Sequence, residues 1–411
     1  MSTISTPGTD APSAETPDYP MTRAAGCPFD PPPTLHTLQT EAPISRVRLW
    51  DGSTPWLVTR YEDQRALLGD PRISADSTLP HYPHAGAGQK ERRRQSRSFI
   101  AMDDPEHARQ RRMATGSFSI KHVEALRPAI QKIVDHLIDE LLAGPKPVDL
   151  VQAFALPVPS LVICELLGVP YADHDFFQAN SKVLIKRTST PEQGRAATEL
   201  VDYLDRLIGD KLAHPADDLL STLAARVRAG ELSRREAADM GLLLLVAGHE
   251  TTANMIALGT LALLQHPDQL ARLRESDDPK VVASAVEELL RYLNIVHSGR
   301  RRVALEDIEI GGVTIRAGEG VVVANDIGNR DPAAFPDPDR LDIARNARHH
   351  VAFGFGVHQC LGQPLARVEL QVVYGTLYRR IPTLRLATDL DQIPFKHDGL
   401  AYGVYELPIT W

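Results

Sequence analysis

The segment from Met240 to about Gln265 is apolar on every side of the helix that its sequence predicts. Such a helix has no face for water, so it must lie inside a large hydrophobic core. Polar residues at its centre need partners there, because an unpaired buried polar group is costly. Thr251 can turn its hydroxyl back to the carbonyl of Ala247, which would open the helix locally. With Glu250 and Thr252 it forms either a groove for a diatomic ligand and water or a set of core polar groups satisfied by their own helix.

The rest of the chain predicts a mainly α fold with a smaller β-rich region. Helical periodicity is nearly continuous from Asp104 to His266, and a last helix is expected from about Leu361 to Arg379. A hairpin is predicted over Ile44 to Thr59, and further strands over Ile308 to Val323. Strands therefore occur on both sides of the helical region, which argues against a division into separately folded parts.

We accordingly expect one intertwined domain over residues 21–411, preceded by a Ser/Thr/Pro-rich, disordered leader over residues 1–20. The leader lacks the basic and apolar regions of a signal peptide, and no segment predicts a membrane span. Three cysteines give no disulfide framework and suit a reducing compartment, so a cytoplasmic location is expected. A formal net charge of −8 argues against nucleic-acid binding.

A glycine-rich loop from Phe353 to Gly362 carries Cys360 directly before the last predicted helix. Glycines such as Gly354 let a loop approach a flat partner closely, because no Cβ is in the way. Free amides at a helix start would favour the thiolate and could donate to its sulfur. Two other interpretations are a buried cysteine in a turn and a metal site, for which the candidate ligands are His349, His350, His358 and Cys360. Structural zinc sites usually have paired cysteines, which this region lacks.

The loop resembles the cysteine motif of the cytochromes P450, F-x-x-G-x-x-x-C-x-G, at Phe353, Gly356, Cys360 and Gly362, with the bacterial variant His358. The cluster AGHETT in the apolar helix resembles the oxygen-activating motif of the same family. The resemblance extends over most of the chain and is greatest to the soluble actinobacterial members that oxidise secondary metabolites and foreign compounds.

The resemblance implies a cytochrome P450 fold, with heme b (iron protoporphyrin IX) between the long central helix and the helix after the cysteine loop. It assigns the axial iron ligand to the thiolate of Cys360, and proton delivery to Glu250 and Thr251. Dioxygen would bind on the Thr251 side. The heme contacts would also include Ala247, Phe353, Gly354 and Gly362.

Two sets of charged residues complete the resemblance. Glu288 and Arg291 match the family's E-x-x-R pair, and Arg340 is the predicted third member; all three are expected to have structural roles. Heme propionates need cationic or hydrogen-bonding partners. The matching positions are His107, Arg111, Arg302 and His358.

The implied activity is a monooxygenase that hydroxylates or epoxidises a lipophilic small molecule. No flavin domain is fused, so electrons from NAD(P)H would arrive through a ferredoxin and a ferredoxin reductase, docking near Arg109 and Arg112. The enzyme is expected to be a monomer.

The expected substrate contacts are the segment before Ser98, the region from Val183 to Pro191, Ala247, Gly248, Ile295, Val296 and Leu400. The basic run KERRRQSR, residues 90–97, is interpreted as a solvated loop or, alternatively, as a contact for an anionic substrate group. Two alternatives stay open: a peroxide-driven peroxygenase or isomerase, and a non-catalytic binding protein.

Overall fold

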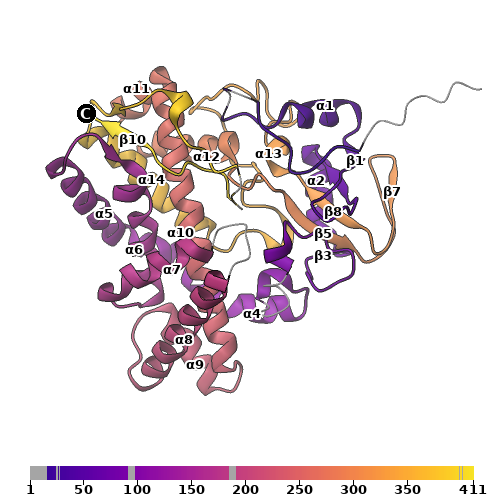
Figure 1. Cartoon of the computed structure of the whole chain (residues 1–411). Helices are drawn as coiled ribbons and strands as arrows, with labels where there is room; N and C mark the ends of the chain where they lie inside the picture. The colour runs from indigo at the N-terminus through magenta and orange to yellow at the C-terminus, as the bar shows by residue number, and fades with distance from the viewer. Residues whose placement is uncertain are drawn as a thin grey trace, which may run out of the picture.

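The computed structural model describes residues 16–24, 26, 28–90, 98–184, 191–397, 399 and 401–411. Leu400, most of the KERRRQSR run and part of the region from Val183 to Pro191 lie outside the described residues. The described part is mainly helical with a smaller β-rich region, as predicted. Figure 1 shows most of the long helices on one side of the molecule and the largest sheet on the other, with the short helices labelled α1 and α2 beside the sheet.

The helices are α1 (Pro33–Glu41), α2 (Tyr61–Gly69), α4 (Glu106–Thr115), α5 (Ile120–Ala143), α6 (Pro157–Leu167), α7 (His174–Leu184), α8 (Pro191–Ala213), α9 (Leu219–Arg228), α10 (Arg234–Gln265), α11 (Pro267–Glu275), α12 (Pro279–Leu293), α13 (Asn325–Gly328) and α14 (Gln363–Arg380). The strands are β1 (Ile44–Arg46), β2 (Trp56–Val58), β3 (Ile73–Ser74), β4 (Val148–Asp149), β5 (Arg300–Ala304), β6 (Ile308–Ile310), β7 (Val313–Ile315), β8 (Gly320–Val323), β9 (Arg385–Leu386) and β10 (Pro408–Thr410).

The long apolar helix predicted from Met240 onward is the part of α10 that follows its first two turns and runs to its end at Gln265. It starts at a capping box, in which the Ser233 hydroxyl accepts from the Glu236 amide and the Glu236 carboxylate accepts from the Ser233 amide. Helices α6, α8, α9 and α14 pack around it, so that most of its residues are buried (Figure 1). By length and composition α10 could cross a membrane, but 67% of its most apolar window is buried inside the protein. It is therefore the core helix of the fold.

The five-stranded sheet has the order β1-β2-β8-β5-β3. The predicted hairpin is confirmed, since β1 pairs antiparallel with β2, Ile44 opposite Val58. β2 then pairs in parallel with β8, and β8 pairs antiparallel with β5, which places Arg300 opposite Val323. Side chains of a strand alternate between its two faces, so Arg300 and Arg302 share one face of β5.

One predicted boundary is wrong. Residues 17–20 belong to the folded body, because the Arg48 amide donates to the carbonyl of Pro17 and the Tyr19 amide donates to the carbonyl of Arg48. The Tyr19 ring is buried in a cluster with Leu35 and Val322. The Ser/Thr/Pro-rich composition concealed this contact, because one buried aromatic side chain and two backbone hydrogen bonds suffice to fix a short extended segment. Residues 1–15 lie outside the described residues.

Candidate active site

A cavity of about 440 Å³ lies between α10 and the loop that carries Cys360. One wall is the α10 segment with Ala247, Gly248 and Thr251, and the opposite wall is the loop and the first turns of α14. Strand β5 closes one side with its arginines. The lining residues that the sequence also selected are Arg111, Ala247, Gly248, Thr251, Val296, Arg302, Phe353, His358, Cys360 and Gly362.

The loop holds Cys360 through its backbone. The Cys360 amide donates to the carbonyl of Phe353 at 2.9 Å, and the Gly354 amide donates to the carbonyl of Val351 at 2.8 Å. Gly356 has φ +73°, and a Cβ there would lie 2.1 Å from the carbonyl oxygen of Leu68 in α2. This glycine is thus required by the close approach of α2, whereas the sequence argument had expected the glycines to face a flat partner.

The Cys360 side chain is accessible because it faces the cavity. Burial of the loop raises the pKa of the Cys360 thiol above its usual value, while Arg300, the Gly362 amide and Arg111 act in the opposite direction. The start of α14 therefore does not by itself make the thiolate the stable form. A metal ion bound at the sulfur would, since a coordinating thiol loses its proton.

The predicted backbone contact on α10 is confirmed: the Thr251 hydroxyl donates to the carbonyl of Ala247 at 2.6 Å. Thr251 lines the cavity, whereas its neighbour Glu250 does not. The Glu250 carboxylate is buried on another face of the helix, where its Oε1 accepts from Lys396 at 2.7 Å. The Thr251 hydroxyl therefore lies at the cavity, and the Glu250 carboxylate lies buried outside the cavity lining.

The cationic residues predicted to hold propionates converge on one side of the cavity. Arg111, Arg302 and His358 line it, and the ring of His107 packs 4.1 Å from that of His358. Burial, helped by Arg302, His107 and Arg111, lowers the pKa of His358 to about 3. The sequence leaves the register of the adjacent Arg300, Arg301 and Arg302 open, and Arg302 is the predicted residue. Arg300 lies beside Arg302 at the cavity because the two residues share one face of β5.

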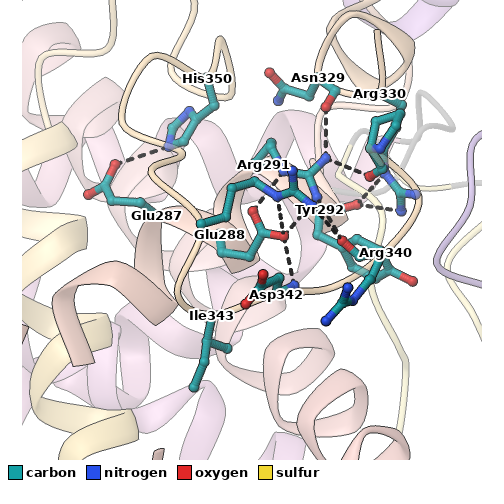
Figure 2. Close-up of polar contacts among 12 residues, drawn as sticks. Glu287, Glu288, Arg291, Tyr292, Asn329, Arg330, Arg340, Asp342, Ile343 and His350 are labelled. Carbon is teal, nitrogen blue, oxygen red and sulfur yellow. Dashed lines mark hydrogen bonds and ion pairs between the residues drawn. The ribbon is translucent and has the colours of Figure 1, made fainter. Parts of the chain in front are cut away.

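The E-x-x-R pair forms a buried network behind the cysteine loop (Figure 2). Arg291 donates to both carboxylate oxygens of Glu288, at 2.7 and 2.8 Å, and both side chains are 0% exposed. The Arg291 guanidinium also donates to the backbone carbonyls of Asn329, Pro338 and Arg340. These bonds tie α12 to the segment that leads into the cysteine loop.

The prediction that the Arg340 side chain completes the E-x-x-R network is wrong. Arg340 is exposed at the end of a turn and contributes its backbone carbonyl, while the third charged side chain is that of Arg345. Arg345 donates from Nε to Glu288 at 3.2 Å and from Nη2 to the Arg340 carbonyl. The sequence spacing could not distinguish the two arginines, because the turn between Asp337 and Arg340 determines which one faces α12.

A second ion pair, which sequence analysis missed, joins α12 to α14. Glu287 accepts from Arg367 at 2.6 Å on Oε1 and at 3.1 Å on Oε2. His350 Nε2 lies 3.2 Å from the same Oε2 (Figure 2). Burial alone would raise the pKa of Glu287, but His350 and the Arg367 guanidinium lower it to about 2. Burial lowers the pKa of His350, so the charge that holds Glu287 is that of Arg367.

This pair predicts a pH-dependent stability. A carboxylate whose folded pKa lies below the unfolded value contributes stability that is present above the unfolded pKa and lost as the pH falls toward the folded pKa. With a usual value of 4.5 and a folded value of about 2, the contribution is on the order of 3 kcal/mol. Glu287→Gln should therefore lower the free energy of unfolding in urea at pH 7, and the difference from wild type should shrink between about pH 4.5 and 2.

The matched control for this experiment is Glu231→Gln, because Glu231 pairs with Arg226 at the surface, where both side chains are almost half exposed. An exposed pair of this kind contributes at most about 1 kcal/mol. A Glu287→Gln difference that does not change with pH would contradict the assignment.

The metal-site alternative for His349, His350, His358 and Cys360 is not supported. Within the described ranges, no group of three or more His, Cys, Asp or Glu side chains is placed to hold a metal ion. His349 instead stacks on the ring of Phe335 at 4.4 Å. A cavity that is lined by the Cys360 sulfur, by arginines of β5 and by Thr251 of a continuous apolar helix is the arrangement expected of a heme-thiolate oxygenase.

Comparison with known proteins agrees with this class. The family model described as cytochrome P450 matches residues 173–383. Cytochrome P450 GfsF of Streptomyces halstedii is 60% identical over 403 residues, covering 97% of each chain. The 20-oxo-5-O-mycaminosyltylactone 23-monooxygenase of Streptomyces fradiae is 44% identical over 396 residues, covering 96% of this chain and 92% of that protein. The chain therefore belongs to the cytochrome P450 family and is a monooxygenase of the actinobacterial type.

Solved structures show the same fold. The crystal structure of GfsF has a TM-score of 0.93 at 60% identity and covers 96% of this chain and 100% of that one. The mycinamicin VIII C21 methyl hydroxylase MycCI of Micromonospora griseorubida, solved with mycinamicin VIII bound, has a TM-score of 0.90 at 43% identity, with 96% and 100% covered. The predicted fold class is thus confirmed.

The residues present fit the family's heme. The sulfur of Cys360 is available in the cavity, and the nearby buried atoms His107 Nε2 and Arg300 Nε have no hydrogen-bond partner in the described part of the chain. The Arg300 Nε–H is a donor that is costly to leave unpaired, and a heme propionate would complete it. His107 Nε2 would donate to the same group when its ring is protonated, because its Nδ1 already faces the Asp104 carboxylate.

Proposed function

We propose that this enzyme hydroxylates or epoxidises a lipophilic natural product, with electrons from NAD(P)H delivered by a ferredoxin and a ferredoxin reductase. The observation that carries the proposal is the position of Thr251 and Ala247 across the cavity from Cys360. Heme bound there would supply dioxygen activation, with electron donation from the thiolate. The chain's own residues then bind and orient the substrate and move protons.

The apolar side of the cavity supports a lipophilic substrate. Leu243, Leu244 and Val296 line it beside Ala247 and Gly248. Apolar lining with few polar groups suits ligands that bury most of their surface. Of the similar proteins, MycCI was solved with mycinamicin VIII, and the Streptomyces fradiae enzyme is named for a mycaminosyltylactone. We therefore propose macrolactones as the first substrates to test.

In this proposal Glu250 and Thr251 deliver protons. Thr251 is placed to hold a water or a proton at the cavity through its hydroxyl, which is oriented by the Ala247 carbonyl. Glu250 is buried one residue earlier in α10, and its Oε2 has no hydrogen-bond partner among the described residues. In the proposal this oxygen takes up a proton and passes it on to Thr251.

Replacing Thr251 tests this role. We expect Thr251→Ala to lower product formation by roughly 10²-fold, the lower range of what a positioned acid or base contributes, while NAD(P)H consumption continues and hydrogen peroxide is released. Thr251→Ser keeps the hydroxyl and should retain most of the product yield. The measurement is product formed per NAD(P)H consumed, with ferredoxin and reductase in excess. Full yield from Thr251→Ala would contradict the proton route and favour a peroxide-driven reaction.

The CO-bound, dithionite-reduced spectrum is the first experiment on the holoenzyme. A strongly red-shifted Soret band is expected for thiolate-bound heme. Binding of a macrolactone should then shift the ferric spectrum, and turnover with the redox partners should give an oxygenated product. Binding without any product, under full electron supply, would favour the non-catalytic alternative.

We further propose that the enzyme is a cytoplasmic monomer whose chain from residue 17 to residue 411 forms one catalytic domain. Ferredoxin would dock on the face near α4, where Arg112 is exposed. Arg109 is a poorer docking residue than the sequence suggested, because it pairs with Glu106 at 2.6 Å and lies 3.3 Å from Glu236. The net charge of −8 supports a partner that is not a nucleic acid.

A further inference from the structure

A buried ion pair outside the cavity holds the proposed proton donor. Lys396 Nζ lies 2.7 Å from Oε1 of Glu250 and 3.0 Å from Oδ1 of Asn254. The Asn254 amide in turn donates to the same Oε1 at 3.1 Å. Glu250, Asn254 and Lys396 are 7%, 2% and 9% exposed. Lys396 thus places its charge deep in the protein, where its partner is an acid of the oxygen-activating motif.

Backbone contacts within the C-terminal segment, between Phe395 and Val404, hold Lys396 against α10. Phe395 and Val404 form an antiparallel bridge, and the Lys396 amide donates to the carbonyl of Gly403 at 2.8 Å. A Cβ on Gly403 would lie only 2.0 Å from Oδ1 of Asn254. A side chain at this position would therefore displace the asparagine or the whole segment. The absence of a side chain lets the segment press against α10 at the place where Lys396 meets Glu250.

The contacts around the carboxylate are asymmetric. Oε1 accepts from both Lys396 and Asn254, whereas Oε2 is buried and has no hydrogen-bond partner among the described residues. Lys396 is the cation paired with Glu250 there, and its ammonium also lies 5.7 Å from the centroid of the Tyr405 ring. A buried carboxylate that loses its only cation is strongly unfavourable. The ion pair therefore keeps the acid in its place while one oxygen stays free.

We propose that Lys396 and Asn254 are positioning residues for proton delivery: they anchor Oε1 of Glu250, so that Oε2 is the oxygen that takes up a proton and passes it toward Thr251. After Oε2 gives up its proton toward Thr251, Glu250 is a carboxylate paired with Lys396, and it becomes an acid again when Oε2 takes up the next proton from solvent. Neither residue lines the cavity. The inference rests on the proposed proton-delivery role of Glu250.

The test compares Lys396→Met, Lys396→Arg and Gly403→Ala in the heme-loaded enzyme. Lys396→Met should lower product formed per NAD(P)H consumed by about 10-fold, part of the contribution of a positioned acid. Lys396→Arg should recover much of the yield, because it restores a cation with several donors. Gly403→Ala should also lower the yield by displacing Asn254. Turnover driven by iodosylbenzene, which needs no proton delivery, should fall far less in Lys396→Met than turnover driven by NAD(P)H.

A second readout does not depend on activity. Lys396→Met should lower the Tm, because it leaves the Glu250 carboxylate buried without a cation, and Glu250→Gln in the same chain should restore most of that loss. The matched control is Lys146→Met, since Lys146 also lies against an aromatic ring, that of Trp411, but at the surface and without contact to Glu250. Lys146→Met should change neither the product formed per NAD(P)H consumed nor the effect of Glu250→Gln on the Tm.

The outcomes separate this inference from the function on which it rests. If Glu250→Gln uncouples turnover but Lys396→Met does not, the positioning role of Lys396 is wrong and the proton route stands. If Glu250→Gln itself leaves coupling unchanged, the proposed proton route is wrong. Additive losses of Tm from Lys396→Met and Glu250→Gln would overturn the ion pair as the link between them.

Discussion

Cys360→Ser is expected to abolish monooxygenation while leaving the fold intact. Serine oxygen is a hard, weakly donating ligand, whereas iron in this site depends on electron donation from a soft thiolate. The red-shifted band of the reduced CO complex should disappear, and product formation should fall by roughly 10³-fold or more, as when one member of a catalytic unit is removed. The loop should keep its shape, because the contacts that fix it are backbone hydrogen bonds and the close approach at Gly356.

The matched control is Cys164→Ser. Cys164 lies in α6, is 3% exposed and belongs to the main hydrophobic core, so it undergoes the same chemical change away from the cavity. This variant should be less stable, because a hydroxyl replaces a buried thiol, yet it should keep the red-shifted band. A red-shifted band that survives in Cys360→Ser, measured on purified protein of known heme content, would contradict the ligand assignment.

The parts of the site that the sequence predicts correctly are local. Thr251 and Ala247 are one helical turn apart, so the helix that its apolar pattern predicts also places the hydroxyl at the carbonyl. The cysteine loop is likewise continuous in the sequence, from Phe353 to Gly362. In both cases backbone geometry over a few residues determines the contact, and no packing between distant elements has to be known.

The parts that the sequence does not predict are contacts across long sequence separations. Lys396 meets Glu250 from 146 residues away, and Arg367 meets Glu287 from 80 residues away. A lysine in the C-terminal segment carries no local sign that it will be buried, since long charged side chains are usually solvated. The choice between Arg340 and Arg345 fails for the same reason, because a turn decides which guanidinium reaches α12.

The E-x-x-R spacing itself shows the limit of a local pattern. Glu106–Arg109, Glu124–Arg127 and Glu288–Arg291 all have it, and all three form ion pairs in the structure. The first two are partly exposed at the surface, whereas both side chains of the third are 0% exposed. Spacing permits the pair without ensuring it, since Glu231 and Arg234 have the same spacing and pair with Arg226 and Asp205 instead. Burial determines the energetic consequence of a pair, and burial depends on the segments that cover α12.

This difference makes Arg291→Met the most destabilising single change that we predict. Removing one partner of a buried ion pair costs about 3–5 kcal/mol, and the carbonyls of Asn329, Pro338 and Arg340 lose their donor as well. Domains have only about 5–15 kcal/mol of stability, so we expect little soluble heme protein from this variant at 37 °C. The measurement is the yield of heme-containing protein and, at lower temperature, the midpoint of urea unfolding.

Two further variants serve as controls for Arg291→Met. Arg127→Met removes the same guanidinium from an exposed pair and should cost less than about 1 kcal/mol. Arg345→Met should have an intermediate effect, because Arg345 is 13% exposed and shares Glu288 with Arg291. If Arg291→Met and Arg127→Met unfolded at the same urea concentration, the buried network would not hold the segment before the cysteine loop. The stability of the Cys360 loop would then have to come from Glu287, Arg367 and the backbone bonds alone.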